Sequence, residues 1–406
     1  MMCGDGTSMT GRRLVYLDHA ATTPTAPEVV EAMLPYFTER FGNPSSIYGI
    51  ARDSKAAVDA AREQVARAIN ASPEEVFVTA GGTEADNWAI KGVAYANRKR
   101  GDHIITSAIE HHAILHTCQY LETQGFRVTY LPVDESGRVS PGDLADAITN
   151  STTIVSIMAA NNEIGTLEPI AECAKICRDR GVRFHTDAVQ AIGSVPVDVE
   201  ALGVDLLSLS AHKFYGPKGV GVLYVRKGVR LDNLLHGGGQ ERRRRAGTEN
   251  LAGIVGMGAA IERAEARREE YAARLTSLRE RLYRGIVERV EHVRLNGHPT
   301  ERLPGNLNCS FEFIEGESML LLLDHAGICA SSGSACTSGS LDPSHVLLAI
   351  GLAHETAHGS LRLSLGESNT EEEIDYVLEA LPPIVERLRT MSPLYANYRR
   401  SCNNVQ

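Results

Sequence analysis

The chain has 406 residues, which is more than one ordinary domain and enough for two. Its 43% hydrophobic and 23% charged residues are typical of a globular, enzyme-sized protein. A net charge of −10 argues against nucleic acid or an anionic membrane as the main partner, and the lack of any run of 18 apolar residues argues against a membrane-spanning helix.

The first ten residues and the cysteines indicate in which cellular compartment the protein works. Residues 1–10 are polar and lack the apolar stretch of a secretory signal. None of the eight cysteines belongs to a Cys-x-x-Cys pair or to a His/Cys cluster with zinc spacing. Cys173 and Cys177 share a helix face, where we expect two core cysteines in preference to a metal site. We therefore predict a reducing, cytoplasmic compartment and no intrinsic metal.

The first predicted elements are short. Residues 14–18 predict a strand, and a polar turn follows it. Residues 27–40 predict a helix. Residues 41–46 form a Gly/Pro loop in which Asn43 could face a site.

Strands and helices then alternate along the chain. The predicted strands are 76–80, 103–107, 128–132, 154–158, 183–188, 206–210 and 221–225. The predicted helices between them include 54–69, 83–99, 113–124 and 170–180. This order predicts an α/β fold with a mostly parallel sheet covered by helices on both faces.

Several unusual residues follow the ends of predicted strands: Gly81-Gly82-Thr83, Glu110-His111, Asn161-Asn162, Asp187 and His212-Lys213. Ligands of such sheets bind beyond the carboxyl ends of the strands. This shared placement is the main internal indication of a site.

Lys213 is the central candidate. It follows the buried strand 206–210 and stands beside His212, where burial and positive charge would favour a deprotonated, nucleophilic amine. Taken alone, the motif fits an ordinary surface lysine at a strand end better than a nucleophilic amine.

Residues 76–87 predict a strand, a glycine turn and a helix start. Thr83 is expected to cap that helix, with Asp86 three residues on. Gly82, Thr83 and the helix dipole would then bind an anion, although many helices begin this way without a ligand. The pattern matches neither the dinucleotide nor the nucleotide-loop motif, so a single phosphate is favoured.

Asp187 and Gln190 follow another buried strand. A buried aspartate needs a cation, such as a protonated ring nitrogen, unless it caps the next helix. His111 could stack on an aromatic ring or be an ordinary surface histidine. A lysine, an aspartate, a stacking histidine and a phosphate cradle at one sheet edge are the set that pyridoxal phosphate requires.

The second half has a different pattern. Residues 231–250 interrupt the alternation and hold four consecutive arginines, 242–245, interpreted as a solvated basic loop. A long helix follows, with Tyr271, Leu275, Leu278, Leu282 and Ile286 on one stripe. The helix at 371–389 is expected to be interrupted by Pro382 and Pro383. We predict a large domain at 20–263 and a smaller α+β domain formed by 1–19 and 264–406.

The chain resembles the cysteine desulfurases of the nitrogen-fixation and iron–sulfur-cluster assembly type, in the class V aminotransferase group of fold type I pyridoxal-phosphate enzymes. The resemblance covers nearly the whole chain. Its motifs include Tyr16-Leu-Asp-His-Ala-Ala-Thr-Thr-Pro, Phe41-Gly-Asn-Pro-Ser-Ser, Asn161-Asn-Glu-Ile-Gly-Thr, His185-Thr-Asp-Ala-Val-Gln, His236-Gly-Gly-Gly-Gln-Glu-Arg and Ser331-Ser-Gly-Ser-Ala-Cys-Thr-Ser-Gly-Ser.

The resemblance implies roles for individual residues. Lys213 would hold the cofactor as a Schiff base, Asp187 would pair with its ring nitrogen, and His111 would stack on the ring. The other implied cofactor contacts are Gln190, Asn162, Gly82, Thr83, Ser210 and His212, with Thr248 reaching the phosphate from the other subunit of a homodimer. Arg362 would bind the substrate carboxylate, helped by Asn43 and Asn162.

Cys336 lies in a segment of small residues, 330–340, which we expect to be mobile. A Ser/Gly linker with an incidental thiol is the structural alternative. The resemblance implies that the Cys336 thiolate takes sulfur from L-cysteine, leaving L-alanine and a Cys336 persulfide. Lys213 would take the Cα proton, and His111 would donate or accept a proton near the leaving group.

The implied partners are L-cysteine, a second copy of the chain and an iron–sulfur scaffold protein as sulfur acceptor. The persulfide could transiently ligate a cluster shared with that scaffold. The alternatives are another class V pyridoxal-phosphate enzyme, namely a selenocysteine lyase or a small-substrate aminotransferase, or a non-catalytic assembly scaffold.

Overall fold

The computed structural model describes residues 13–332 and 343–403. Cys336, most of the predicted 330–340 loop and residues 1–12 lie outside the described residues. Within those limits, none of the helices combines the length and apolar character that crossing a bilayer requires.

The largest sheet of the described chain has seven strands in the order β2-β8-β7-β6-β5-β3-β4. They span β2 Val76–Thr79, β8 Gly221–Val225, β7 Leu206–Ser210, β6 Arg183–Asp187, β5 Thr152–Ser156, β3 His103–Ser107 and β4 Arg127–Leu131. The pairs from β7 through β4 are parallel, while β8 runs antiparallel to both of its neighbours. The predicted mostly parallel sheet is confirmed.

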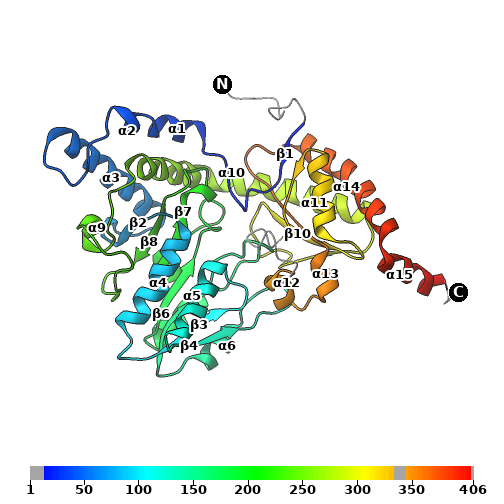
Figure 1. The fold of residues 1–406 in the computed structure, drawn as a ribbon, viewed down its shortest axis with the longest axis horizontal. Helices are drawn as coiled ribbons and strands as arrows, with labels where there is room; N and C mark the ends of the chain where they lie inside the picture. Colours follow the sequence, from blue (N-terminus) through cyan, green and yellow to red (C-terminus); the bar gives the residue numbers. More distant parts are fainter. Residues whose placement is uncertain (1–12, 333–342, 404–406) are drawn as a thin grey trace.

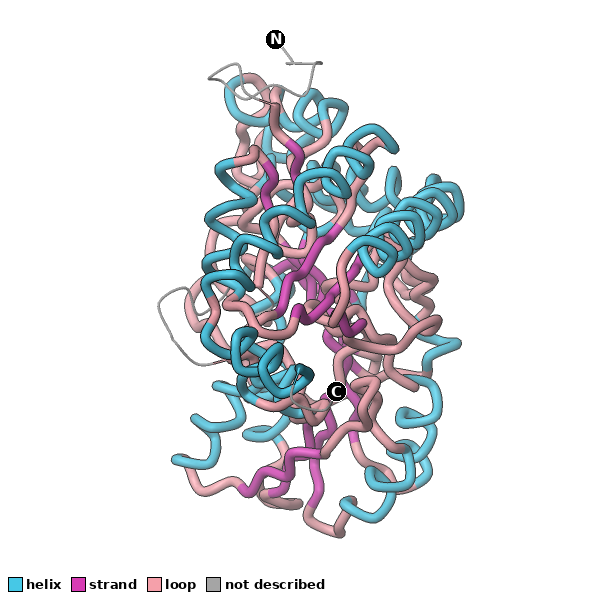
Figure 2. The backbone as a smooth tube through the Cα atoms, turned by 90° about the vertical axis from the view of Figure 1, so that its right-hand side faces the viewer, coloured by secondary structure: helices cyan, strands magenta, loops and turns pink. Residues whose placement is uncertain are grey.

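Adjacent residues of the central strands point into two different cores. Phe77, Ile104 and Leu206 pack with helices α4 (Gly82–Ala96) and α5 (His112–Thr123) on one face. Their neighbours Val78, Ile105 and Leu207 pack with helices on the other face. Those helices are α1 Pro27–Met33, α3 Gly49–Ala68, α7 Ile170–Asp179 and the first part of α10 Leu251–Arg289. Because both faces are apolar, the strands carry continuous rather than alternating apolar runs. Figure 2 shows helices on either side of the strands.

A further core, separate from the two that flank the seven-stranded sheet, lies beyond this sheet. It packs the three-stranded sheet β12-β10-β9 against α11 (Gly316–His325), α14 (Glu371–Met391) and the end of α10. The strands are β9 Val293–Leu295, β10 Asn306–Phe311 and β12 Ser360–Ser364, and the short β1 Val15–Tyr16 pairs with β11 Ile328–Cys329. The predicted apolar stripe on α10 is confirmed, since Leu275, Leu278, Leu282 and Ile286 are buried in this core. Figure 1 shows α10 running from one part of the molecule into the other. The domain boundary proposed at 263/264 therefore falls inside one continuous helix.

The remaining elements are short or lie at the edges. They are α2 Pro35–Thr38, η1 Pro73–Glu75, α6 Pro141–Ala147, α8 Val199–Leu202, η2 Ala211–Lys213, α9 Gln240–Arg243, α12 His345–Ala349, α13 His354–His358 and α15 Pro393–Asn403.

Prolines changed two predicted helices in opposite ways. The helix expected over 27–40 is split into α1 and α2, and Pro35, which lacks an N–H, begins the second piece. The expected interruption at Pro382 and Pro383 is wrong, because α14 runs unbroken over Glu371–Met391. Ile374, Val377, Leu378, Leu381 and Val385 are buried on both sides of the prolines. The burial of these side chains stabilises α14 as one helix, although the two prolines remove backbone hydrogen bonds.

The arginine run is not simply a solvated loop. Arg245 makes two hydrogen bonds to the carboxylate of Glu84, at 2.8 and 2.9 Å. Arg242 donates to the carbonyl of Val76 at 2.6 Å. The run therefore fastens residues 240–245 to α4 and β2.

Candidate active site

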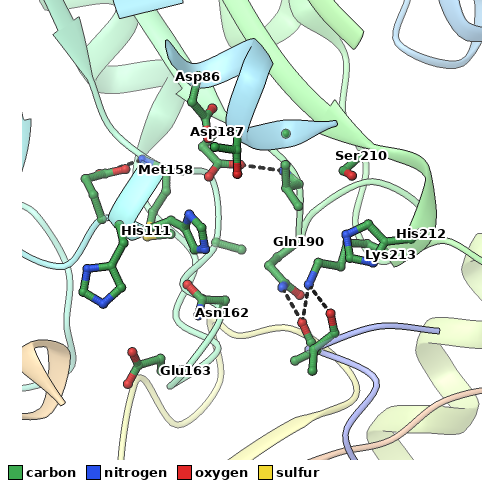
Figure 3. A pocket seen from close by; sticks show the side chains of 18 of the residues that line it. Asp86, His111, Met158, Asn162, Glu163, Asp187, Gln190, Ser210, His212 and Lys213 are labelled. Atoms are coloured by element: carbon green, nitrogen blue, oxygen red, sulfur yellow. Dashed lines mark hydrogen bonds between the residues drawn. The ribbon is translucent and has the colours of Figure 1, made fainter. Parts of the chain in front are cut away.

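A cavity of about 310 Å³ opens at the carboxyl ends of the parallel strands. Ten residues predicted from the sequence line it: Gly82, Thr83, His111, Asn162, Asp187, Gln190, Ser210, His212, Lys213 and Arg362. Figure 3 shows most of them around one space. The strand ends that looked unusual in the sequence therefore meet in one place.

Lys213 ends the short helix η2, directly after β7. Its Nζ donates to the carbonyls of Ala20 and Ala21 at 2.5 and 2.8 Å. Gln190 Nε2 donates to the same Ala20 carbonyl at 3.0 Å. The segment after β1 thus holds the lysine amine at the cavity (Figure 3).

The N-terminus of α4, where the sequence predicts an anion cradle, lies at the cavity. Gly81 has φ +150°, a conformation that favours glycine, and a Cβ on Gly82 would lie 2.8 Å from Val189 Cγ2. Glycine at 81 therefore permits the turn, and glycine at 82 permits the close packing of the start of α4 on Val189. Ser210 and His212 line the same end of the cavity.

The expectation that Thr83 caps α4 is wrong. The N-cap residue is Gly81, and no side chain caps the helix. Instead Glu84 Oε2 accepts a hydrogen bond from the Ala80 amide at 2.9 Å. Thr83 lines the cavity without serving the helix end.

His212 is held by the N-terminal segment, its Nδ1 lying 3.1 Å from Thr22 Oγ1. Burial and the charges of Lys213 and Lys218 lower its pKa to about 4. The imidazole is neutral at physiological pH.

Asp187 ends β6 and is 6% exposed. Its Oδ1 accepts a hydrogen bond from the Val189 amide at 2.9 Å. Burial raises the pKa of the carboxyl to about 6, while the Val189 amide and the charge of Lys213 oppose the rise. A carboxyl in this position gains most from a cation inside the cavity.

His111 is the N-cap of α5, and its Nδ1 accepts a hydrogen bond from the Ala113 amide at 3.1 Å. That bond orients the ring and leaves the proton on Nε2. Burial, then the charge of Lys213, lowers its pKa to about 4. A neutral ring fixed at a cavity wall is suited to stacking.

Arg362 comes from the other sheet, on β12, and is 2% exposed. Nη1 donates to the Asn162 carbonyl at 3.1 Å and Nη2 to Asp18 Oδ1 at 2.9 Å. Among the described residues its Nε has no hydrogen-bond partner. A buried guanidinium with a spare donor at the cavity is suited to a carboxylate.

Two predicted residues lie outside this cavity. Asn43 is exposed, and its Oδ1 accepts a hydrogen bond from the Ser45 amide at 2.9 Å. Thr248 is exposed in the stretch before α10. Within the described chain, no group of three or more His, Cys, Asp or Glu side chains is arranged to hold a metal ion.

Three further buried carboxyls line the cavity: Asp86, Glu110 and Glu163. Glu110 Oε1 accepts from Ser107 Oγ at 2.6 Å and from the Met158 amide at 2.9 Å, and burial raises its pKa to about 8. Burial raises the pKa of Glu163 to about 7, although Ser344 Oγ donates to it. For Asp86 the sequence held a usable signal, since it is an acid on the otherwise apolar face of α4, beside Ala85, Ala89 and Ile90.

Comparison with known proteins gives a consistent picture. The family model described as "Aminotransferase class-V" matches residues 15–377. "Cysteine desulfurase IscS" of Clostridium botulinum (strain Hall) is 62% identical over 389 residues, covering 95% of this chain and 98% of the relative. The protein of the same name from Methanosarcina thermophila is 61% identical over 385 residues, covering 95% of each.

Solved structures agree with this. A "NifS-like protein" is 41% identical with a TM-score of 0.87 and covers 92% of this chain and 100% of its own. The structure of "SspA in complex with cysteine" is 37% identical with a TM-score of 0.77, covering 86% of this chain and 98% of its own. The chain therefore belongs to the class V aminotransferase family and, within it, to the cysteine desulfurases.

Proposed function

We propose that the chain uses pyridoxal phosphate to remove sulfur from L-cysteine, giving L-alanine and a persulfide on Cys336. The observation that carries this proposal is the meeting of Lys213 and Asp187 at one cavity with the N-terminus of α4. The residues fit the cofactor. The glycine turn and α4 offer amide donors to a phosphate, and Asp187 offers a buried carboxylate to a ring nitrogen.

When bound, pyridoxal phosphate supplies an electron-withdrawing ring that makes the α-proton of an amino acid acidic. Lys213 would hold the cofactor aldehyde and would move the α-proton with its amine. Asp187 would keep the ring nitrogen charged, and His111 would hold the ring in place and exchange a proton near the sulfur. The cofactor would be oriented by Gln190, Asn162, Ser210, His212, Gly82 and Thr83.

The sulfur transfer balances without an added oxidant or reductant. The bond between Cβ and Sγ of L-cysteine breaks, and a bond forms between that sulfur and the Cys336 thiolate. Cβ receives the electron pair and a proton, which makes the methyl group of L-alanine. The substrate sulfur, now bound to Cys336, is oxidised to the level of a persulfide.

Arg362 supports cysteine as the substrate class. Its guanidinium is fixed by Asp18 and the Asn162 carbonyl and lines the cavity, where it would bind the carboxylate of an amino acid. The cysteine bound in the similar SspA structure agrees with this assignment.

We further propose a homodimer in which Asn43 and Thr248 complete the site of the partner subunit. The stretch around Asn43 exposes the apolar side chains of Leu34, Phe37, Phe41, Ile47 and Tyr48. A face this apolar is typical of a protein–protein contact. A second copy on this face would bury these side chains and give the exposed Asn43 and Thr248 a role.

An iron–sulfur scaffold protein in the cytoplasm is the proposed acceptor of the persulfide sulfur. The Cys336 persulfide would then transiently ligate the cluster being assembled.

One experiment tests the whole proposal. Borohydride reduction followed by peptide mass spectrometry should place a pyridoxyl group on Lys213. Incubation with L-cysteine in the absence of a reductant should give one alanine per added sulfur atom on Cys336. With excess dithiol as the reductant, the persulfide sulfur should be released and alanine and sulfide should form in equal amounts. Cys336→Ser should keep the reducible group and lose the persulfide. Turnover of Cys336→Ser at the parental rate would exclude this nucleophile. Amino transfer that depends on a keto acid would indicate an aminotransferase. A preference for selenocysteine over cysteine would indicate a selenocysteine lyase. A colourless protein would indicate a scaffold.

A further inference from the structure

Two carboxyl groups lie next to each other in the floor of the cavity, Asp86 from α4 and Asp187 from β6 (Figure 3). Asp86 is 1% and Asp187 6% exposed. They are the two buried aspartates of the described chain. Two negative charges this close in a buried site repel strongly, so the pair holds one proton.

The histidine nearest to Asp86 does not neutralise it. His185 Nε2 lies 3.8 Å from Asp86 Oδ1, too far for a hydrogen bond. Both ring nitrogens of His185 already have partners, Ser156 Oγ at 2.8 Å and Ser208 Oγ at 2.9 Å. Burial lowers the pKa of His185 to about 3, so its ring is neutral. The third carboxyl nearby, Glu110, disfavours a charge on Asp86 only when Glu110 is itself ionised.

The two aspartates differ in their hydrogen bonds. Asp187 Oδ1 accepts from the Val189 amide, and the charge of Lys213 also favours its ionised form. Asp86 Oδ1 has no hydrogen-bond partner among the described residues. A buried carboxylate oxygen without a donor is costly, whereas a protonated carboxyl places its own O–H there. Burial and the charge of Asp187 raise the pKa of Asp86 well above its usual range, although Ser208 opposes the rise.

We propose that Asp86 is a positioning residue that carries the proton of the Asp86–Asp187 pair, leaving Asp187 as the single negative charge at the cavity. The chemical meaning of this inference rests on the proposed role of Asp187 toward the cofactor ring nitrogen. Asp86 would act on the charge of Asp187 through their proximity in the cavity floor.

Infrared difference spectroscopy of the purified protein tests the proposal. Labelling of all aspartate side-chain carboxyls with ¹³C separates aspartates from the buried glutamates. At pH 7.5 we expect the C=O band of a protonated, labelled aspartate. Asp86→Asn should remove the band, because asparagine has the shape of the protonated acid, while Asp187→Asn should keep it.

The cofactor spectrum provides a second reading. Asp86→Asn leaves Asp187 charged, so the pH midpoint of the cofactor absorbance should move by less than about half a unit. Glu168→Gln is the matched control. Glu168 is a buried carboxyl that does not line the cavity, its Oε1 lacks a partner among the described residues, and burial raises its pKa to about 8. This control should change neither the aspartate band nor the midpoint.

Three results would overturn the proposal: no protonated aspartate band in the parent, a band that survives Asp86→Asn, or a band lost in Asp187→Asn. The parent measurement needs no variant, so poor folding of a variant leaves it decisive. The band is also independent of sulfur transfer. Loss of the proposed function would appear as a missing persulfide with the band intact.

Discussion

The cavity has two walls that come from different parts of the fold. The floor is formed by the ends of the seven-stranded sheet and carries Lys213, Asp187 and His111. The facing wall comes from the three-stranded sheet and carries Arg362. The floor contains several acids and a lysine amine, whereas the facing wall offers a guanidinium paired with Asp18. Under the proposed function, the two walls would have different roles. The floor would bind the cofactor, and the facing wall would select an amino acid by its carboxylate.

Removal of the Lys213 amine from the floor should have the largest effect on activity. Lys213→Ala should lower kcat at least ~10³-fold, because it removes both the cofactor anchor and the group that moves the α-proton. Alanine formation from L-cysteine measures the effect. Lys213→Arg is the control, since it keeps the positive charge without a nucleophilic amine. If Lys213→Arg formed alanine from L-cysteine at the parental rate, the proposed role of the Lys213 amine would be wrong.

The facing wall should respond differently. Arg362→Gln removes a charge-assisted bond to the substrate carboxylate, so KM for L-cysteine should rise roughly 10- to 100-fold with kcat changed only a few-fold. Steady-state kinetics separates the two constants. Gln190→Ala, on the floor, should leave KM for L-cysteine less affected. An unchanged KM in Arg362→Gln would mean that the carboxylate binds elsewhere.

The smallest effect concerns the stability of the floor. Glu110 is fully buried and its pKa is raised to about 8, so the folded protein retains a proton that the unfolded chain releases above its ordinary pKa near 4.5. The parent should therefore lose stability as pH rises from 5 to 8, by about 1 kcal/mol per unit from this group.

Glu110→Gln keeps an oxygen for Ser107 and removes this titration. Its Tm relative to the parent should rise by about 3 °C between pH 5 and 8, since a chain of this size shifts by about 1 °C per kcal/mol. Calorimetry at several pH values measures the slope. If the difference in Tm between Glu110→Gln and the parent were the same at pH 5 and pH 8, Glu110 would not titrate in this range. On the acid side, the lowered pKa of His185 works in the opposite direction, because stability falls as the unfolded chain gains protons below pH 6.5.

The central sheet could be predicted because its strands are continuous apolar runs with polar ends. The strands 103–107, 206–210 and 221–225 match the structure at both ends. Lys213 and Asp187 could be found for a related reason, since Asp187 is the last residue of β6 and Lys213 lies three residues beyond the end of β7. The prolines of α14 misled the prediction, because burial of the surrounding side chains is a property of the folded molecule.

The remaining site residues depend on contacts between distant parts of the chain. Asp86 fits a helix-capping pattern in the sequence, and only the packing of α4 on the sheet brings it beside Asp187. Asn43 and Thr248 lie on the surface of one chain, so their proposed roles need a second copy. Cys336 could be named from its motif, and it lies outside the described residues.

One short stretch, residues 18–23, touches both walls. Asp18 holds Arg362, the carbonyls of Ala20 and Ala21 hold Lys213, and the Thr23 amide donates to the His212 carbonyl at 3.0 Å. Proteolytic trimming of the amino end past this stretch would deprive both walls of contacts at once. Such a shortened chain would lack the hydrogen bonds that hold Lys213 and Arg362, so the two proposed roles, cofactor attachment and carboxylate binding, should weaken together.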